Sequence, residues 1–325
     1  MRNSKNVIKV ILVTAVTVCL LVFLDFALYP CTFIRNDIHA VSENTYQDIY
    51  MGASYGKINI DPSTIEDISG RTGHNLCVGG EYTMDTYYLV KLMCERGHAP
   101  ERIIYEVSPA YFTREKEEGN NFLLFYHEFP FGMTKLDYFF NAVSDCNLRT
   151  LFFPWYEYPL NYEISHMQET MQRKWNRDYS AEGMSTASQE YHEDGFIERY
   201  PVDPESFTLD GLYEIWPEDI LPENMDYLAK TIELCKENGI EFIGISTPLA
   251  EPTLEAFGEG DEALWAYFGD FFEQHGVQYI NFNDDAHYDL TDHSVENYTD
   301  LDGHMNGDAA RAFSRVLAKV LNPIG

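Results

Sequence analysis

The sequence is poor in basic residues. It has 22 lysines and arginines against 53 aspartates and glutamates in 325 residues, a formal net charge of −31 at pH 7. Nucleic acid and anionic lipid headgroups repel so acidic a surface, which argues against both as partners of the bulk of the chain. The charge suits a soluble surface outside a cell, but it does not identify a substrate.

Paired cysteines are also lacking. The six cysteines are scattered, and no Cys-x-x-Cys pair occurs. This spacing excludes a zinc ribbon and a thioredoxin-like redox site. One disulfide and a set of core thiols both remain open.

Long apolar runs are missing, with one exception near the N-terminus. Residues 10–24 are apolar apart from Thr14 and Thr17, and the run extends past Asp25 to Tyr29. About 20 residues is close to the length that crosses ~30 Å of hydrocarbon. The run therefore predicts one transmembrane helix.

The residues on either side of this run predict its orientation in the membrane and whether it is cleaved. Only basic charges precede it, so the positive-inside rule keeps the N-terminus in the cytoplasm. No Ala-x-Ala-like site follows Leu24, which favours an uncleaved anchor over a signal peptide. We expect residues 1–29 to form a cytoplasmic tail and a single-pass anchor in the cell membrane. Residues 30–325 are expected to form an extracytoplasmic domain.

Beyond the anchor, short apolar strands alternate with amphipathic helices. This alternation predicts an α/β fold with a parallel sheet covered on both faces, of the doubly wound, flavodoxin-like kind. The predicted strands are 46–51, 75–78, 102–107, 240–245 and 277–282, and the main helices are 84–95, 223–238, 264–274 and 307–321.

Residues 112–221 interrupt this alternation. The segment is rich in Tyr, Phe and Pro and holds Trp155, Trp175 and Trp216. We interpret it as a long aromatic-rich insertion or lid. Its aromatic rings could stack on sugars, or they could form the segment's own core, which is the commoner fate of such residues.

Ser54 is the candidate nucleophile. It lies in Gly52-Ala53-Ser54-Tyr55, directly after the first predicted strand, and Gly80 and Ser108 follow the next two strands. In parallel sheets the functional groups gather beyond the carboxyl ends of the strands. A serine in a strand-to-helix turn can project its hydroxyl beside backbone amides that face an oxyanion. The alternative is an ordinary turn.

A serine nucleophile needs a base, and His304 is the best candidate. It stands directly before the last helix, with Asp300 and Asp302 as possible orienting acids. An acidic loop around His287 and His293 offers a rival base or a cation site, but a solvated loop explains it more simply.

These motifs and their order resemble the SGNH (GDSL-like) hydrolase superfamily. The chain is most similar to membrane-anchored members of the type of the D-alanyl transfer protein DltD and the alginate acetylation proteins. Ser54 matches the nucleophile after the first strand. Gly80 in Asn-Leu-Cys-Val-Gly-Gly matches an oxyanion amide donor, and His304-Met305-Asn306 matches the histidine block. The resemblance covers residues 46–110 and 223–321.

Two positions depart from the superfamily pattern. Ala110 stands where the superfamily has an oxyanion-hole Asn, a loss typically worth ~3 kcal/mol of transition-state stabilisation. Ser108 and Tyr111 are the candidates to replace that donor. Leu301 stands three residues before the histidine, where the acid is usual. We favour Asp302 as the acid and keep Asp300 open.

The resemblance implies an O-acyl transferase or esterase that acts on a cell-envelope polysaccharide or teichoic-type polymer. In this scheme Asp302 orients His304, His304 removes the proton of Ser54, and Ser54 forms the acyl-enzyme. The Gly80 and Ser54 amides hold the oxyanion. No cofactor is needed, and a multi-span membrane O-acyltransferase is the implied partner. The alternatives are a catalytically weak accessory or glycan-binding subunit, which the two departures favour, and a free-standing carbohydrate or lipid esterase.

Overall fold

A central parallel sheet organises the domain. The computed structural model describes residues 2–80, 82–116, 123–146, 148–153, 155 and 164–322. The sheet has the strand order β2-β1-β3-β6-β7, and every neighbouring pair is parallel. Numbered among themselves along the chain, these strands run 2-1-3-4-5, the order of flavodoxin-like sheets. The strands are β1 (Asp48–Met51), β2 (Gly73–Asn75), β3 (Arg102–Glu106), β6 (Glu241–Ser246) and β7 (Gln278–Asn281).

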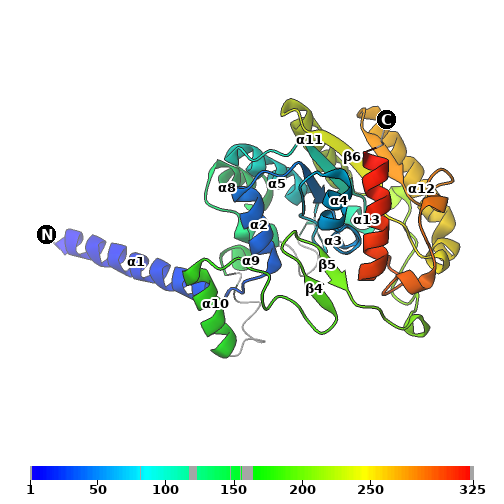
Figure 1. The fold of residues 1–325 in the computed structure, drawn as a ribbon. Coiled ribbons are helices and arrows are strands. Elements are labelled where there is room, and N and C mark those ends of the chain that lie inside the picture. The colour runs from blue at the N-terminus through cyan, green and yellow to red at the C-terminus, as the bar shows by residue number, and fades with distance from the viewer. Residues whose placement is uncertain are drawn as a thin grey trace.

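Helices cover both faces of this sheet (Figure 1). Successive strand residues point to opposite faces, so Ile103 and Tyr105 join one hydrophobic core and Ile104 joins the other. The first core includes α2 (Phe33–Glu43), α5 (Thr83–Arg96), α11 (Pro222–Glu237) and α12 (Glu251–Gln274), and the second includes α4 (Pro62–Ser69) and α13 (Gly307–Leu321). The predicted parallel α/β sheet covered on both faces is therefore present.

Two elements differ from the sequence prediction. The second strand is Gly73–Asn75 and not 75–78. Its side chains are polar but buried, whereas the prediction followed the apolar residues just beyond them. Helix α12 begins at Glu251 and not at residue 264. Its first half contains two glycines, which weaken a helical pattern when it is read from sequence.

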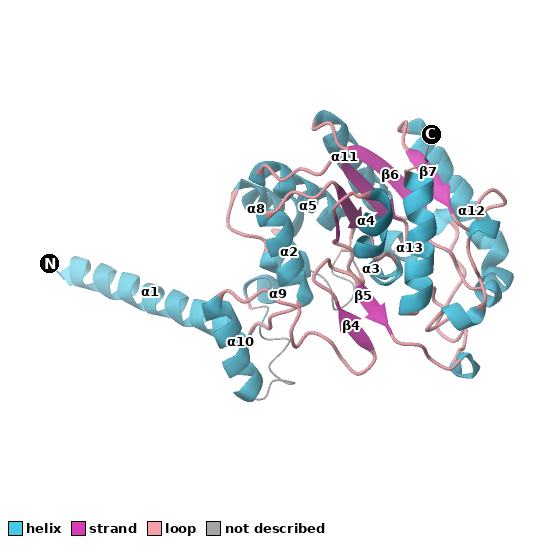
Figure 2. Cartoon of the chain, in the orientation of Figure 1, coloured by secondary structure: helices cyan, strands magenta, loops and turns pink. Residues whose placement is uncertain are grey.

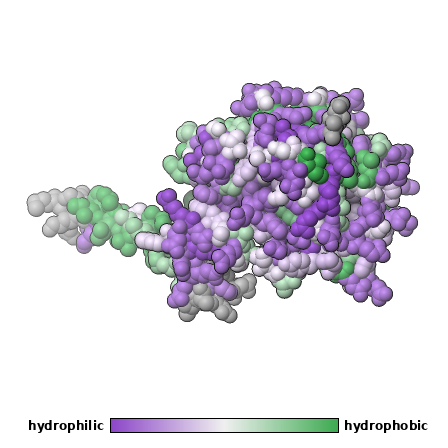
Figure 3. Space-filling model, in the orientation of Figure 1, coloured by the Kyte–Doolittle hydropathy of each residue, from purple (hydrophilic) through white to green (hydrophobic). Residues whose placement is uncertain are grey.

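Helix α1 (Arg2–Leu28) extends from the body of the molecule (Figure 1). Residues 6–28 form an apolar stretch with a mean hydropathy of 2.8, and its most apolar 18 residues are not buried, so the helix is long and apolar enough to cross a membrane. In Figure 3 it is a green, apolar rod beside a largely purple body.

The end of α1 is part of the domain. Ala27 and Tyr29 are only 1% and 5% exposed. Helix α10 (Ile164–Asn176) packs beside it, and Lys174 Nζ donates to the carbonyls of Asp25 and Tyr29 at 3.2 and 2.7 Å. Helix α2 begins four residues after Tyr29.

The segment predicted as an insertion packs against the domain along much of its described length (Figure 2). Tyr138, Phe125 and Phe129 are buried in the same core as the sheet. Trp175 is 82% exposed. The described elements of this segment are α7 (Leu124–Glu128), α8 (Met133–Tyr138), the π-helical turn η1 (Phe139–Val143), α9 (Leu148–Phe152), α10, the antiparallel hairpin of β4 (Gln189–Tyr191) and β5 (Ile197–Arg199), and the short 3-10 helices η4 (Pro204–Ser206) and η5 (Pro217–Asp219). The remaining elements of the domain are two short α-helices, α3 (Ser54–Asn59) and α6 (Pro109–Phe112), and the 3-10 helices η6 (Tyr288–Leu290) and η7 (Val295–Asn297).

All six cysteines lie in the described residues, and none of them is in a disulfide.

Candidate active site

Ser54 stands at the first residue of α3, just beyond the carboxyl end of β1. The turn that carries it needs a glycine at position 52. Gly52 has φ of +132°, and a Cβ there would lie 2.4 Å from the carbonyl oxygen of Glu106. Because only glycine tolerates both conditions, the chain can turn sharply between strand and helix. Ser54 is thereby left partly exposed at the edge of the sheet.

The Glu106 side chain holds the backbone of this turn by hydrogen bonds. Its Oε2 accepts hydrogen bonds from the amides of Ala53 and Gly56, on either side of Ser54, at 3.2 and 3.3 Å. Ser108 Oγ donates to the same carboxylate. Glu106 is 1% exposed, and burial raises its pKa to about 7 despite these hydrogen bonds. The sequence prediction missed this residue, although a carboxylate at the end of a buried strand is an unusual feature.

His304 lies within hydrogen-bond distance of Ser54. Its Nε2 is 2.8 Å from Ser54 Oγ, and the residue is 6% exposed. Two contacts fix the backbone here. Asn59 Oδ1 accepts from the amide of Met305, and Asn306 caps α13 by accepting from the amide of Ala309. The structure thus brings together the predicted nucleophile and base, which are 250 residues apart in sequence.

Asp300 completes the arrangement. Its Oδ2 is 2.8 Å from His304 Nδ1, and its Oδ1 accepts the amides of Asp302, Gly303 and His304 at 3.1–3.2 Å. Burial alone would raise the pKa of Asp300, but the hydrogen bonds and charge of His304, with a smaller effect of Arg199, lower it to about 2. An ionised Asp300 that accepts from Nδ1–H leaves Nε2 as the acceptor for the Ser54 hydroxyl.

Asp302, the favoured acid in the sequence prediction, does not hold His304. Its Oδ2 lies 4.0 Å from His304 Nδ1, and its Oδ1 accepts instead from the hydroxyl of Tyr55 at 2.9 Å. The difference comes from the turn itself, because the Asp300 side chain folds back onto three successive amides, as Asp often does in turns.

The two other predicted oxyanion residues differ in placement. Gly79 lies next to Ser54, since a Cβ on it would be in ordinary van der Waals contact with Ser54 Cβ, at 3.5 Å. This contact brings the Gly79-Gly80 turn to the nucleophile. Gly80 has φ of +84°, and within the described residues no acceptor is recorded for its amide. Ser108, by contrast, turns its hydroxyl to Glu106 and so does not offer it to the site.

No family model matches this chain. No curated protein matches it either.

A cavity of about 230 Å³ begins beside this arrangement. Tyr55 and Asp302 form its border with His304, since the Tyr55 ring lies 5.2 Å from the imidazole. Ala110 contributes only a methyl group to the wall. The remainder of the lining is mixed. It contains aliphatic and polar side chains together with four aromatic ones, Tyr111, Tyr213, Phe257 and Trp265.

One carboxyl group in the cavity wall has no protein partner. Oδ2 of Asp261 is buried and unbonded within the described part of the chain. Burial and the nearby charge of Glu214 raise the pKa of Asp261 to about 7. A protonated Asp261 can donate a hydrogen bond to a ligand oxygen in the cavity.

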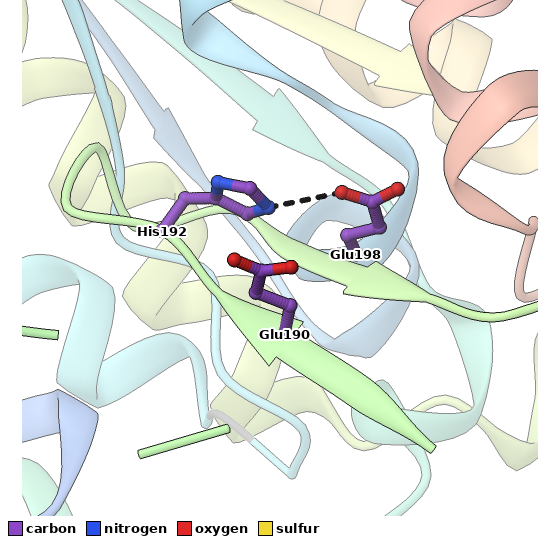
Figure 4. A group of neighbouring side chains, drawn as sticks. All are labelled: Glu190, His192 and Glu198. Carbon is purple, nitrogen blue, oxygen red and sulfur yellow. Dashed lines mark hydrogen bonds and ion pairs between the residues drawn. The ribbon is translucent and has the colours of Figure 1, made fainter. Parts of the chain in front are cut away.

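A possible metal cluster lies elsewhere, on the β4–β5 hairpin. Figure 4 shows His192 and Glu198 turned toward each other, with Glu190 beside them. Both oxygens of Glu198 accept from Arg311, at 2.9 and 2.5 Å, so the positive charge beside this carboxylate is supplied by the guanidinium group of Arg311. This cluster is better explained as an ion-pair network. Among the described residues, no group of three ligand atoms gathers in the acidic loop around His287 and His293.

Proposed function

We propose that this protein is a membrane-anchored O-acyl transferase or esterase of the SGNH type, acting through a Ser54–His304–Asp300 acyl-enzyme mechanism. The observation that carries the proposal is the unbroken hydrogen-bond chain from Ser54 Oγ through both nitrogens of His304 to Asp300, with 2.8 Å at each step. Nucleophile, base and orienting acid in this relation activate a serine hydroxyl on many unrelated folds.

The reaction begins when Ser54 Oγ attacks an ester carbonyl carbon while His304 Nε2 accepts its proton. As the bond between Ser54 Oγ and the carbonyl carbon forms, an electron pair of the C=O bond moves onto the carbonyl oxygen. In this proposal the amides of Ser54 and Gly80 hold that oxyanion. His304 then returns the proton to the leaving alcohol oxygen as its C–O bond breaks, which leaves the acyl group on Ser54. An acceptor hydroxyl then attacks the acyl carbon while His304 Nε2 takes its proton. The bond between the acyl carbon and Ser54 Oγ breaks, and His304 returns that proton to Ser54 Oγ.

The surroundings support a small acyl or sugar group as the part of the substrate that enters the domain. The cavity of about 230 Å³ lies below the ~300–1,000 Å³ usual for drug-sized ligands, and the aromatic side chains in its lining suit a sugar ring. With α1 as an anchor, the acceptor would be a cell-envelope polysaccharide or teichoic-type polymer. A multi-span O-acyltransferase in the same membrane would supply acyl groups.

One observation favours a second candidate function. Ala110 lines the cavity with a methyl group, and Ser108 turns its hydroxyl to Glu106, so neither residue gives the oxyanion a side-chain donor. A site with one donor fewer loses about 10²–10³ in turnover. On this view the protein is a catalytically weak accessory or glycan-binding subunit.

The decisive experiment is labelling of the full-length protein, in detergent micelles, with a fluorophosphonate probe. We expect labelling of the wild type and of Ser144→Ala, an exposed serine that serves as control, and none of Ser54→Ala. Mass spectrometry should place the adduct on Ser54. Labelling that survives Ser54→Ala would refute the proposed nucleophile, and a wild type that takes no label would favour the accessory function.

A second measurement separates transfer from hydrolysis. An activated acyl ester is supplied with and without a polysaccharide acceptor. Polymer-bound acyl that depends on Ser54 supports a transferase, whereas free acid formed at the same rate in both cases supports an esterase.

A further inference from the structure

Arg199, on the hairpin of the central segment, reaches the orienting acid of the proposed site. It is the last residue of β5, and its Nη1 donates to Asp300 Oδ2 at 2.7 Å and to Thr299 Oγ1 at 3.1 Å. Arg199 precedes Asp300 by 101 residues, and no sequence motif connects them. The contact is therefore a product of the fold alone.

The acceptor capacity of Asp300 explains why this contact matters. Its Oδ1 is engaged by three backbone amides. Its Oδ2 is shared by two donors, His304 Nδ1 and the guanidinium of Arg199. The positive charge of Arg199 thus lies on the one oxygen that faces the imidazole.

The hairpin holds Arg199 in place through contacts with four separate parts of the domain. The amide of Asn75 donates to the carbonyl of Asp194, and Ser63 donates to the Asp194 side chain. Tyr191 donates to the buried Asp37 at 2.7 Å. Glu198, next to Arg199, is bound by the guanidinium of Arg311 on α13, and Figure 4 shows the same Glu198 facing His192 across the hairpin.

Close backbone packing at the tip adds to these contacts. Gly195 has φ of +88°, and a Cβ on it would lie 2.1 Å from the carbonyl oxygen of Asn75. The hairpin therefore sits against β2 at a separation that only glycine allows.

We infer that Arg199 is a positioning residue that fixes the Asp300 carboxylate and sets the pH range in which His304 acts as a base. The inference rests on the site of the proposed function. A guanidinium on Oδ2 offsets part of the negative charge that Asp300 presents to the imidazole. The imidazolium form of His304 is then less favoured, so the neutral, proton-accepting form persists to lower pH.

Other groups around His304 keep their charges when Arg199 is changed. On the same loop, Asp302 lies 4.0 Å from Nδ1. From α3, Tyr55 packs its ring against the imidazole and binds Asp302. From the end of β3, Glu106 supports the Ser54 turn. The carboxylates of Asp302 and Glu106 favour the imidazolium when they are ionised, whereas burial raises the pKa of Tyr55 and keeps its hydroxyl neutral. Within the described residues, Arg199 is the arginine that is hydrogen-bonded to the orienting acid.

The test is the pH profile of Ser54 labelling by a fluorophosphonate in the full-length protein between pH 4.5 and 9. In Arg199→Gln we expect the acid limb to move to higher pH by about 0.5–1 unit, with the alkaline plateau changed less than about threefold. Arg199→Lys keeps the charge and should restore the wild-type limb. Arg71→Gln is the matched control, because it removes an ion-paired arginine at the start of the strands.

A second readout separates this inference from the proposed function. The His304 ring signal, assigned with His304→Gln, is titrated by NMR in the wild type and in Arg199→Gln. Its midpoint should move in the same direction even in a chain that takes no label, so failure of labelling alone leaves the role of Arg199 measurable. Arg199→Met replaces Arg199→Gln if the latter does not fold.

Three results would overturn the inference. In the first, both the labelling profile and the His304 titration of Arg199→Gln superimpose on those of the wild type. Another is a loss of labelling that is equal at every pH, with an unmoved His304 titration, which a purely structural role would produce. The last is an Arg199→Lys variant that behaves as Arg199→Gln does.

Discussion

Asp300 and Asp302 provide the sharpest test of the proposed site, because the structure assigns them different partners. Each is changed to Asn, which keeps the shape of the side chain and removes its charge. Asp300 accepts from His304 at 2.8 Å, whereas Asp302 lies 4.0 Å away and binds Tyr55. The first change should therefore impair the activation of Ser54, and the second should affect it little.

The expected magnitudes follow from these distances. Unit charges separated by 2.8 Å attract by about 6 kcal/mol at an effective dielectric constant of ~20, which is a suitable value near a protein surface. Loss of this attraction corresponds to about 10⁴ in rate, similar to the loss when a triad aspartate becomes asparagine. The Asp302 side chain is 47% exposed, so water screens its charge more strongly. With the dielectric constant of bulk water, ~80, a charge at 4.0 Å contributes about 1 kcal/mol, which is less than tenfold in rate.

The assay is the second-order rate constant of Ser54 labelling at the pH optimum, with thermal unfolding curves to show that both variants fold. We expect Asp300→Asn to label about 10³–10⁴ times more slowly than the wild type and Asp302→Asn to stay within tenfold. The reverse order, or equal effects of the two changes, would refute the assignment of Asp300.

The other predictions concern stability. Burial raises the pKa of Glu106 from 4.5 to about 7, so the folded protein binds an extra proton at this carboxyl group, and Glu106 alone contributes a loss of about 3 kcal/mol in stability as the pH rises from 4.5 to 7. Glu106→Gln should lessen the fall in stability between pH 5 and pH 8, measured by urea unfolding, by most of that contribution, and an unchanged fall would contradict it. Lys57 lies 2.7 Å from Asp37, and both are almost fully buried. Lys57→Met should cost about 3–5 kcal/mol, and adding Asp37→Asn should recover part of it. Equal unfolding midpoints for the single and double variants would contradict this account.

The sheet could be predicted from sequence because its strands are short and apolar and its helices are amphipathic. The strand at Gly73–Asn75 was displaced in the prediction for a physical reason. His74 and Asn75 are buried through hydrogen bonds to Asp37, Gly56 and other groups, and hydropathy does not reveal such partners.

In the candidate site, too, some residues could be predicted from the local sequence and others could not. Ser54 and His304 stand beside regular elements, so local pattern locates them. The choice between Asp300 and Asp302 depends on which side chain folds back onto the amides of its own turn, which spacing cannot determine. Arg199 arrives from a distant hairpin, and only tertiary packing places it on Asp300.

The junction between α1 and the domain has a consequence for how such a protein meets its substrate. Ala27 and Tyr29 are buried, Lys174 binds the last carbonyls of the helix, and α2 follows almost at once. With α1 in a bilayer, the domain stands on a stiff stalk and does not swing on a tether. Ser54 then keeps a constant height and heading above the lipid, so lateral diffusion would bring it to its acceptors. Only polymer segments that reach that height would come within its range.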